Sequence, residues 1–443
     1  MNKNEPYKRI IVFLVGFVVW SLMVALWSYE WMSNYANTIL RPFGYKGNWL
    51  VFAVYGILVA FFTHIYNGYK VGQYRISDIV FSCGFAMLVS NIITYLQTCL
   101  VARALLMPFP FLRMSVIQFG IIIIWALFAN RIYRRLFPPH QMLLVYDGSE
   151  SATHLISKMV NRDEKYRIIE SISISAGIDT VLKKIDEHNA VILCDIKSSE
   201  RNRFLKHCYD NSIRTYVTPK IADILIRGAS DINIFDTPLV VIKGYGLRFE
   251  QRAAKRALDI VGSLFGIIIA FPLMLLIALF IKLQDGGPVL FKQERCTKDN
   301  KVFTIIKFRS MVINPAGEGE FQATVDGDPR ITKIGKLLRP MRLDELPQLF
   351  NILKGEMSLV GPRPECLEHI EKYTAEIPEF TFRSRVKAGL TGYAQVVGRY
   401  NTSAYDKLKL DLMYISRYSF LEDIKIIIMT IKILFTKQST EGF

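Results

Sequence analysis

Two neighbouring carboxylates, Asp344 and Glu345, lie in the densest block of chemically useful residues, which runs from Arg339 to Gly355. Apolar residues at helical spacing over 346–353 predict a short amphipathic helix. Its first turn can contain a proline because the first N–H groups have no intrahelical partner. Asp344 is therefore expected at or near the N-cap, where free N–H groups and the helix dipole favour carboxylates and phosphates.

Adjacent carboxylates on a helix point about 100° apart, so Asp344 and Glu345 are poorly placed to share one proton. They could instead divide the labour, one as a nucleophile and the other as a ligand of a divalent cation. The alternative is structural: Asp344 caps the helix and Glu345 is a solvated charge of its first turn. The spacing alone leaves both interpretations open.

Several basic residues lie on either side of this block. Arg363 stands between two prolines, whose restricted backbone would preorganise a guanidinium for bidentate phosphate binding. Lys307 and Arg309 lie upstream, and Arg399 follows a glycine downstream. Taken singly, each is more often ordinary surface charge.

A second amphipathic helix is predicted over 328–339. Its isoleucines and leucines form one stripe, and Lys333 and Lys336 lie opposite. Such a basic face could hold acidic headgroups or a lipid phosphate beside a membrane, or it could simply be solvated.

The distribution of charge indicates the kind of partner. The chain has 443 residues, 51% of them hydrophobic, and a net charge of +16. Residues 1–140 carry a net +9, residues 141–247 carry none, and residues 248–443 carry +7. The basic segments also hold the long apolar runs, which suits a membrane surface and phosphates, and we expect no nucleic-acid partner. The six cysteines show no CxxC or zinc spacing and are expected to be reduced.

Four uncharged stretches, at 10–29, 47–69, 79–102 and 114–130, each approach the roughly 20 residues that a membrane-crossing helix needs. Basic residues precede the first stretch and follow the fourth, which favours both ends in the cytoplasm. Residues 141–247 differ in character. Strand-like runs at 142–146, 167–174, 190–194 and 213–217 alternate with helical patterns, which predicts a small α/β domain with a mostly parallel sheet. The first strand is followed by YDGSE and not by GxGxxG, so dinucleotide binding is not supported.

A fifth uncharged run, 260–281, is long enough to cross a membrane but contains Pro272 in its middle. It predicts either a kinked span or a re-entrant helix that leaves on the side it entered. A fifth span would place Cys296 and Cys366 in an oxidising space, so we favour the re-entrant helix, over about 257–283. The shorter run 424–435 predicts an interfacial helix.

The segment from Arg248 onward resembles the catalytic domain of bacterial sugar transferases, the monotopic polyprenyl-phosphate phosphoglycosyl transferases. The resemblance covers some 190 residues and rests on seven ordered motifs: KRALDI at 255–260, GPVLFKQER at 287–295, KFRSM at 307–311, DPRIT at 328–332, LDELPQ at 343–348, SLVGPRP at 358–364 and GLTGYAQ at 389–395. Gly398 and Arg399 follow. Residues 340–342 depart from the family, where a more polar tripeptide precedes the two carboxylates.

The resemblance implies an activity and its residues. Asp344 would attack the sugar-bearing phosphate of a UDP-sugar and release UMP, and undecaprenyl phosphate would accept the phosphosugar. Glu345 would help to bind Mg²⁺. The residues expected to handle phosphate or nucleotide are Lys307, Arg309, Arg339, Arg363 and Arg399. UDP-glucose, UDP-galactose and their N-acetylated relatives stay open as the sugar donor, and a non-catalytic membrane scaffold is the alternative function.

The predicted architecture is a membrane protein of α plus α/β class with three parts. Residues 1–136 form a four-helix transmembrane bundle, 137–247 a Rossmann-like domain without a nucleotide fingerprint, and 248–443 an α-rich monotopic catalytic domain with the re-entrant helix, broken at Pro272. The resemblance further implies the bacterial inner membrane, a catalytic domain at its cytoplasmic face, and the initiating step of capsule, O-antigen or exopolysaccharide synthesis. We also expect a homodimer, with the middle domain as its interface.

Overall fold

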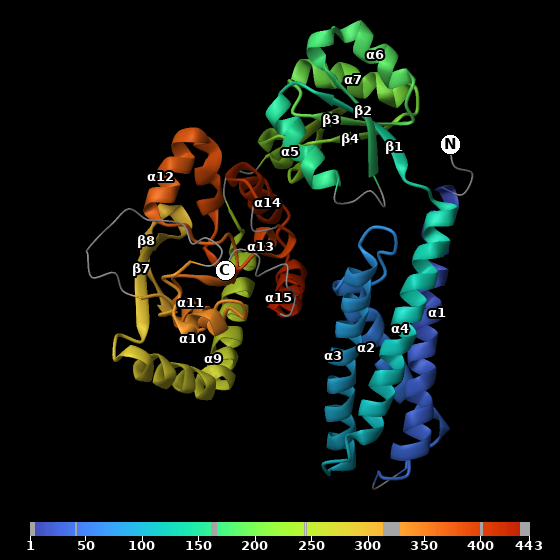
Figure 1. Ribbon diagram of the computed structural model, residues 1–443, viewed down its shortest axis with the longest axis vertical. Coiled ribbons are helices and arrows are strands. Elements are labelled where there is room, and N and C mark those ends of the chain that lie inside the picture. Colours follow the sequence, from blue (N-terminus) through green and yellow to red (C-terminus); the bar gives the residue numbers. More distant parts are fainter. Residues whose placement is uncertain are drawn as a thin grey trace. The chain divides into compact units, whose positions relative to one another are not determined.

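In the computed structural model the chain forms two units, Met1–Thr218 and Pro219–Phe443, which are described separately (Figure 1). The structure describes residues 5–39, 42–160, 166–242, 244, 246–312, 328–398 and 402–434. The predicted limits at 136/137 and 247/248 stay a prediction. In the structure, the helix and hairpin that follow residue 218 belong to the second unit.

The first unit begins with four long apolar helices: α1 (Lys8–Glu30), α2 (Tyr45–Ile65), α3 (Ile76–Ala102) and α4 (Phe109–Leu136). Each is long and apolar enough to cross a membrane. α1 packs against α2 and α4, and α3 packs against the same two helices. The predicted helices are therefore confirmed, and this part of the chain has the composition of a membrane protein.

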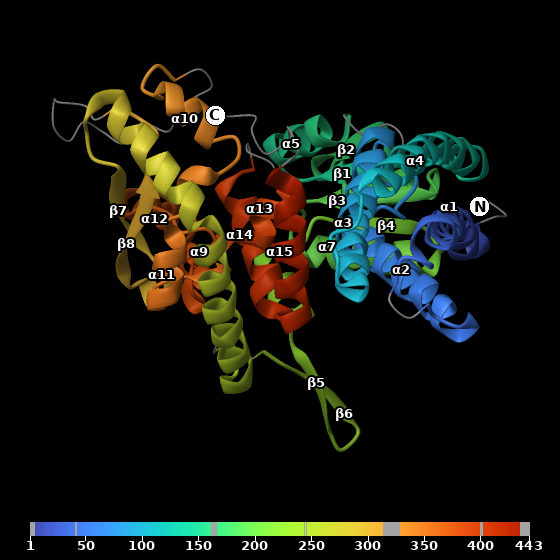
Figure 2. The ribbon, with the colours of Figure 1, turned by 90° about the horizontal axis from the view of Figure 1, so that it is seen from below.

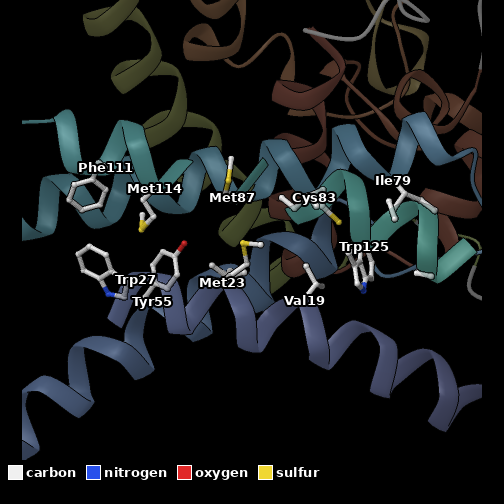
Figure 3. Packing of buried hydrophobic residues seen from close by; sticks show 14 of the residues in the cluster. Val19, Met23, Trp27, Tyr55, Ile79, Cys83, Met87, Phe111, Met114 and Trp125 are labelled. Carbon is white, nitrogen blue, oxygen red and sulfur yellow. The ribbon is translucent and has the colours of Figure 1, made fainter. Parts of the chain in front are cut away.

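Aromatic and sulfur-containing side chains fill the space between these four helices (Figure 3). Trp27 is fully buried, and its ring centroid lies 5.1 Å from that of Phe111 and 5.5 Å from that of Tyr55. One group of buried polar side chains in this core is paired: the Tyr55 hydroxyl donates to Asn91 and accepts from Gln118, each at 2.8 Å. Such pairing lowers the cost of burying polar groups where no water can satisfy them.

A four-stranded parallel sheet follows, in the order β2-β1-β3-β4, built from β1 (His140–Tyr146), β2 (Tyr166–Ser173), β3 (Ala190–Cys194) and β4 (Arg214–Val217). Alternate residues of β1 face opposite sides, because side chains on a strand have a period of two. One face packs against α6 (Ile178–Asp186) and α7 (Ser198–Asp210), and the other against α5 (Ser149–Val160). The predicted parallel α/β fold is confirmed.

The second unit is organised around α9 (Phe249–Asp285), which contains Pro272. Figure 1 shows α9 as two arms that meet at a sharp bend, and Figure 2 shows the same bend from below. A proline inside a helix removes one backbone hydrogen bond and its ring crowds the preceding turn, which explains a bend near this position. α9 is also long and apolar enough to cross a membrane.

Smaller elements pack around the two arms. The second unit further contains α8 (Ile221–Arg227), β5 (Ser230–Ile234), β6 (Thr237–Val241), β7 (Leu290–Cys296), β8 (Val302–Phe308), α10 (Lys333–Leu338), α11 (Gln348–Lys354), β9 (Ser358–Val360), α12 (Leu367–Glu376), β10 (Gly389–Thr391), α13 (Tyr393–Val397), α14 (Ala404–Ser416) and α15 (Phe420–Leu434). β5–β6 and β7–β8 are antiparallel hairpins, and β9 and β10 form a short parallel pair.

Two predicted helices are shorter than their sequence patterns. α10 starts only at Lys333, because the Thr332 hydroxyl accepts a hydrogen bond from the Gly335 N–H at 2.9 Å and thus caps the helix there. α11 begins at Gln348 with Pro347 as its N-cap residue. Asp344, predicted at or near the N-cap, therefore lies three residues before it and does not cap α11.

Candidate active site

Asp344 and Glu345 lie in a single 3-10 turn, Leu343–Glu345, which we call the dyad turn. The residue before it, Arg342, adopts a left-handed backbone conformation with φ of 52°. That conformation costs a non-glycine residue about 1–2 kcal/mol, so the surrounding packing must hold it in place. Leu343 provides part of that packing, since it contacts the apolar cluster of Met274 and Ile277 on the second arm of α9.

One buried asparagine fastens α11 to β8. The Asn351 amide donates to the Thr304 carbonyl at 2.8 Å, and its oxygen accepts from the Ile306 N–H at 3.1 Å. In addition, Leu349 and Ile352 of α11 belong to the same apolar cluster as Ile305 of β8. These contacts place the end of β8, and with it Lys307, beside the dyad turn.

A close backbone crossing positions the third segment of the site, which leaves β9 at Gly361. A Cβ at Gly361 would lie only 2.3 Å from the Lys387 carbonyl oxygen, so only glycine permits this approach. Two residues later, the Arg363 carbonyl accepts a hydrogen bond from the Arg383 guanidinium at 2.9 Å. The Arg363 side chain is thereby directed from a fixed backbone towards Glu345.

Glu345 is buried and held by two cations. Its Oε1 lies 2.9 Å from Arg363 Nη2 and 3.3 Å from Lys307 Nζ. Burial opposes ionisation of this carboxyl, but Arg363, Lys307 and Arg342 outweigh it and hold the pKa of Glu345 well below its usual range. Glu345 is therefore a fixed anion at neutral pH.

Asp344 differs from its neighbour. Burial, and then the charge of Glu345, raise the pKa of Asp344 to about 6, although Lys307, Arg339 and Arg363 act in the opposite direction. Among the described residues its carboxylate makes no hydrogen bond and no ion pair, and the side chain retains some exposure. Its oxygens are thus free to react or to bind a ligand.

The dyad is surrounded by more positive than negative charge. Four basic side chains act on the two carboxylates: Lys307, Arg339, Arg342 and Arg363. Burial lowers the pKa of Arg342 despite its nearness to Glu345 and Asp344. The sequence did not identify Arg342 as a site residue, because nothing in a sequence predicts a left-handed arginine. The surplus of cations favours a ligand with about two negative charges, such as a diphosphate.

Of the predicted residues that the structure describes, Arg309 is not brought to this cluster. Arg309 is buried at the far end of α9, where its guanidinium donates to Asp285. A Cβ on Gly287 would lie only 2.7 Å from the Arg309 Nη1, so the Arg309 side chain would have to shift if any other residue stood at position 287. Arg399 lies outside the described residues, and its role stays a prediction.

The donor set at the dyad suits one kind of metal ion. Among the described residues no group of three or more His, Cys, Asp or Glu side chains is placed to hold a metal by itself. Mg²⁺, however, is commonly bound by one or two carboxylates together with substrate phosphates. Asp344 and Glu345 supply two carboxylates beside a diphosphate-sized excess of positive charge, so these residues fit Mg²⁺ held jointly with a phosphorylated ligand.

Comparison with known proteins agrees with this arrangement. Residues 250–437 match the family described as bacterial sugar transferase. A UDP-glucose:undecaprenyl-phosphate glucose-1-phosphate transferase from Caulobacter vibrioides is 42% identical over 187 residues, which are 41% of this chain and 70% of that protein.

Two further relatives are larger. A UDP-N-acetylgalactosamine-undecaprenyl-phosphate N-acetylgalactosaminephosphotransferase from Aeromonas hydrophila is 38% identical over 55% of this chain and 57% of its own length. A UDP-glucose:undecaprenyl-phosphate glucose-1-phosphate transferase from Klebsiella pneumoniae is 41% identical over 46% and 43%. The match thus spans about half the length of these two proteins. Because the match to the family includes the dyad turn and every basic side chain around it, the chain belongs to the bacterial sugar transferase family.

Proposed function

We propose that the chain transfers a sugar 1-phosphate from a UDP-sugar to undecaprenyl phosphate and releases UMP. The names of the relatives support this reaction, since three of them carry it in their description. The observation that carries the proposal is the unequal pair at the dyad turn. Glu345 is held in two ion pairs, whereas Asp344 has free oxygens and a raised pKa.

Asp344 can then react with the two substrates one after the other. Asp344 is ionised at neutral pH, and one of its oxygens attacks the sugar-bearing phosphorus. A phosphorus–oxygen bond to Asp344 forms, the bond to the bridging oxygen breaks, and UMP leaves with that oxygen. A phosphate oxygen of undecaprenyl phosphate next attacks the same phosphorus, which releases the Asp344 carboxylate and gives the polyprenyl diphosphate sugar.

The basic side chains supply the electrostatic part of the catalysis. Phosphoryl transfer depends mainly on positioning and on neutralising charge. Arg363 and Lys307 lie within hydrogen-bonding reach of the dyad, and Arg339 and Arg342 act on it electrostatically, so these four would bind the diphosphate and stabilise the departing UMP. Glu345, together with Asp344, would hold Mg²⁺, which supplies further neutralisation of the diphosphate.

The surroundings of the site suit a lipid acceptor. In our proposal α9 is a re-entrant helix whose bend at Pro272 lies in the bilayer, while the dyad stays at the cytoplasmic face of the bacterial inner membrane. The support is the bend of α9 (Figure 1) and the many exposed apolar side chains on both arms. We further propose α1–α4 as a transmembrane bundle, a homodimer, and a role in starting capsule, O-antigen or exopolysaccharide synthesis.

The covalent route can be tested with the purified chain, Mg²⁺ and a panel of UDP-sugars. Without acceptor, the wild type should release about one UMP per active site and retain a labelled phosphosugar on the protein. Asp344→Asn should abolish both signals, because an amide is not a competent nucleophile. Asp299→Asn makes the same charge change at an exposed position and serves as the matched control.

The other mechanisms predict different results. In a single displacement UMP appears only when undecaprenyl phosphate is added and no label stays on the protein. UMP release by Asp344→Asn at the wild-type rate would exclude the covalent intermediate. A non-catalytic scaffold, the less supported alternative, would release no UMP with any donor and acceptor.

A further inference from the structure

A cavity in the second unit lies away from the dyad turn, at the start of α9. It measures about 740 Å³, which falls in the range of small-molecule sites. Arg256 on its wall donates to the Ile352 and Leu353 carbonyls at 2.7 and 2.8 Å. These carbonyls belong to the C-terminal turn of α11, whereas the dyad turn lies before the N-terminus of that helix. The cavity is therefore separate from the candidate active site.

Basic residues dominate the wall of this cavity, with seven Lys or Arg and two acidic residues. Besides Arg256, three of the charged groups already have partners. Lys255 donates to Asp423 at 2.8 Å, Lys298 pairs with Asp299 at 3.5 Å, and Asp259 accepts from the Ser358 hydroxyl and the Leu359 N–H. Among the described residues, the side chains of Arg252 and Lys387 have neither a hydrogen bond nor an ion pair. The cavity is thus short of negative charge.

The cations of the wall lie close enough to repel one another. Burial, and then the charge of Arg256, lower the pKa of Lys387, and Lys298 and Lys255 act in the same direction while Asp259 opposes them. A folded chain keeps like charges together at a cost, and a bound anion would remove that cost. The Arg256 guanidinium is also held by two carbonyls, so part of the site is preorganised.

We propose that this cavity is a second anion site, which binds a phosphate group through Arg252 and Lys387 on a wall preorganised by Arg256. Guanidinium and ammonium groups are the usual protein ligands of phosphate. The site directly precedes the uncharged run 260–281 of α9, and basic clusters next to a membrane helix attract acidic headgroups. The phosphate can therefore belong to an acidic glycerophospholipid or to a soluble phosphate compound.

The test uses the full chain in a neutral detergent and a double variant, R252Q/K387Q. The matched control is K372Q/R417Q, which removes one lysine and one arginine at exposed positions of the same unit. Retention of dioleoyl phosphatidylglycerol is measured by native mass spectrometry, with phosphatidylcholine as the uncharged-lipid reference. Binding of pyrophosphate is measured separately, as the rise in the thermal midpoint with concentration. Elution volume and circular dichroism establish that each variant is folded.

We expect the wild type and the control to bind at least one probe. R252Q/K387Q should bind that probe at least about tenfold more weakly, since two charge-assisted hydrogen bonds are lost. Loss of phosphatidylglycerol alone identifies a lipid headgroup, and loss of pyrophosphate a soluble phosphate. Equal affinity of both double variants for both probes, or no binding by the wild type, overturns the proposal. No readout depends on UMP release, so this result is independent of the proposed transferase activity.

Discussion

Arg342 is the residue whose contribution to the candidate site was least visible in the sequence. Its guanidinium acts on both carboxylates of the dyad, and its left-handed backbone starts the turn that carries them. We expect Arg342→Gln to lower kcat/KM for the UDP-sugar by about tenfold or more, since a charge-assisted contact is worth about 1.5–3 kcal/mol. Lys336→Gln, an exposed charge on α10, is the control. Unchanged kcat/KM in Arg342→Gln would remove this residue from the site.

Asp411 gives a pH-dependent prediction for stability. It is buried against the Arg383 guanidinium, 2.8 Å away. Burial raises the pKa of Asp411 to about 6 even though Arg383 and Lys407 oppose the rise, while Glu365 adds to it. The folded protein therefore binds this proton more tightly than the unfolded chain does, and the resulting stabilisation is lost as the pH rises from about 4 through 6.

Asp411→Asn cannot titrate at this position, so it does not lose this stabilisation as the pH rises. The difference between its thermal midpoint and that of the wild type should therefore shift in favour of the variant as the pH is raised from 5 to 7.5. The change should correspond to at most about 3 kcal/mol. Asp299→Asn, at an exposed acid, should show no such pH dependence. A difference between wild type and Asp411→Asn that is constant over this range would contradict the raised pKa.

The sequence singled out Asp344, Glu345, Lys307 and Arg363 in separate motifs, and the structure brings these four residues together. Their roles in a reaction stay predictions. Asp344 was predicted at or near the N-cap of α11, but the cap is Pro347 and Asp344 lies three residues before it, in a turn that Leu343 packs against α9. Pairings such as that of Arg309 with Asp285 depend on packing that no local pattern shows.

At the scale of elements, α9 and α15 are joined by a buried ion pair. Lys255 Nζ lies 2.8 Å from Asp423 Oδ2, and the Tyr414 hydroxyl donates to the other carboxylate oxygen at 2.6 Å. Lys255→Met should lower the free energy of unfolding by about 3–5 kcal/mol, because it leaves Asp423 charged and buried without its cation. Urea titration in detergent micelles measures the loss.

A second substitution separates charge from packing. Lys255→Met combined with Asp423→Leu should recover most of the loss, since two apolar groups of similar size can replace a buried pair. Lys425→Met breaks an exposed pair with Glu422 on the same helix and should cost less than about 1 kcal/mol. Equal losses in Lys255→Met and Lys425→Met would show that the buried pair contributes nothing special.

Element types followed from periodicity wherever the pattern was long. The strands at 142–146 and 190–194 and the helices around them were predicted because apolar runs and turn residues alternate clearly there. The hairpin β7–β8 and the parallel pair β9–β10 were not, because charged residues interrupt the apolar pattern of β7 and because β9 and β10 have only three residues each. These short elements nevertheless position Lys307 and Arg363.

At the scale of the whole molecule, the charge distribution follows the two kinds of surface the chain presents. The neutral segment 141–247 builds the parallel α/β fold up to residue 218, and the basic segments contain the five long apolar helices found among the described residues. In the second unit the cations have separate uses: one group surrounds the dyad turn and another lines the cavity at the start of α9. The net charge therefore indicates phosphate ligands better than a nonspecific attraction to anions.

Two cysteine positions can distinguish a re-entrant α9 from one that spans the membrane. Ala254 and Leu283 are exposed near the two ends of α9. A straight helix would separate them by about 43 Å, more than the roughly 30 Å of hydrocarbon, so a spanning helix puts them on opposite sides. A helix bent at Pro272 returns Leu283 to the side of Ala254.

Single-cysteine variants Ala254→Cys and Leu283→Cys, in a background without the six native cysteines, should therefore both react with a membrane-impermeant maleimide in inside-out vesicles and not in right-side-out vesicles. Phe271→Cys, next to the bend, should stay unlabelled in both because thiolates do not form in hydrocarbon. Labelling of the two end positions from opposite sides would make α9 a fifth span. The dyad turn, which packs on the second arm, could then not share a compartment with residues 131–135.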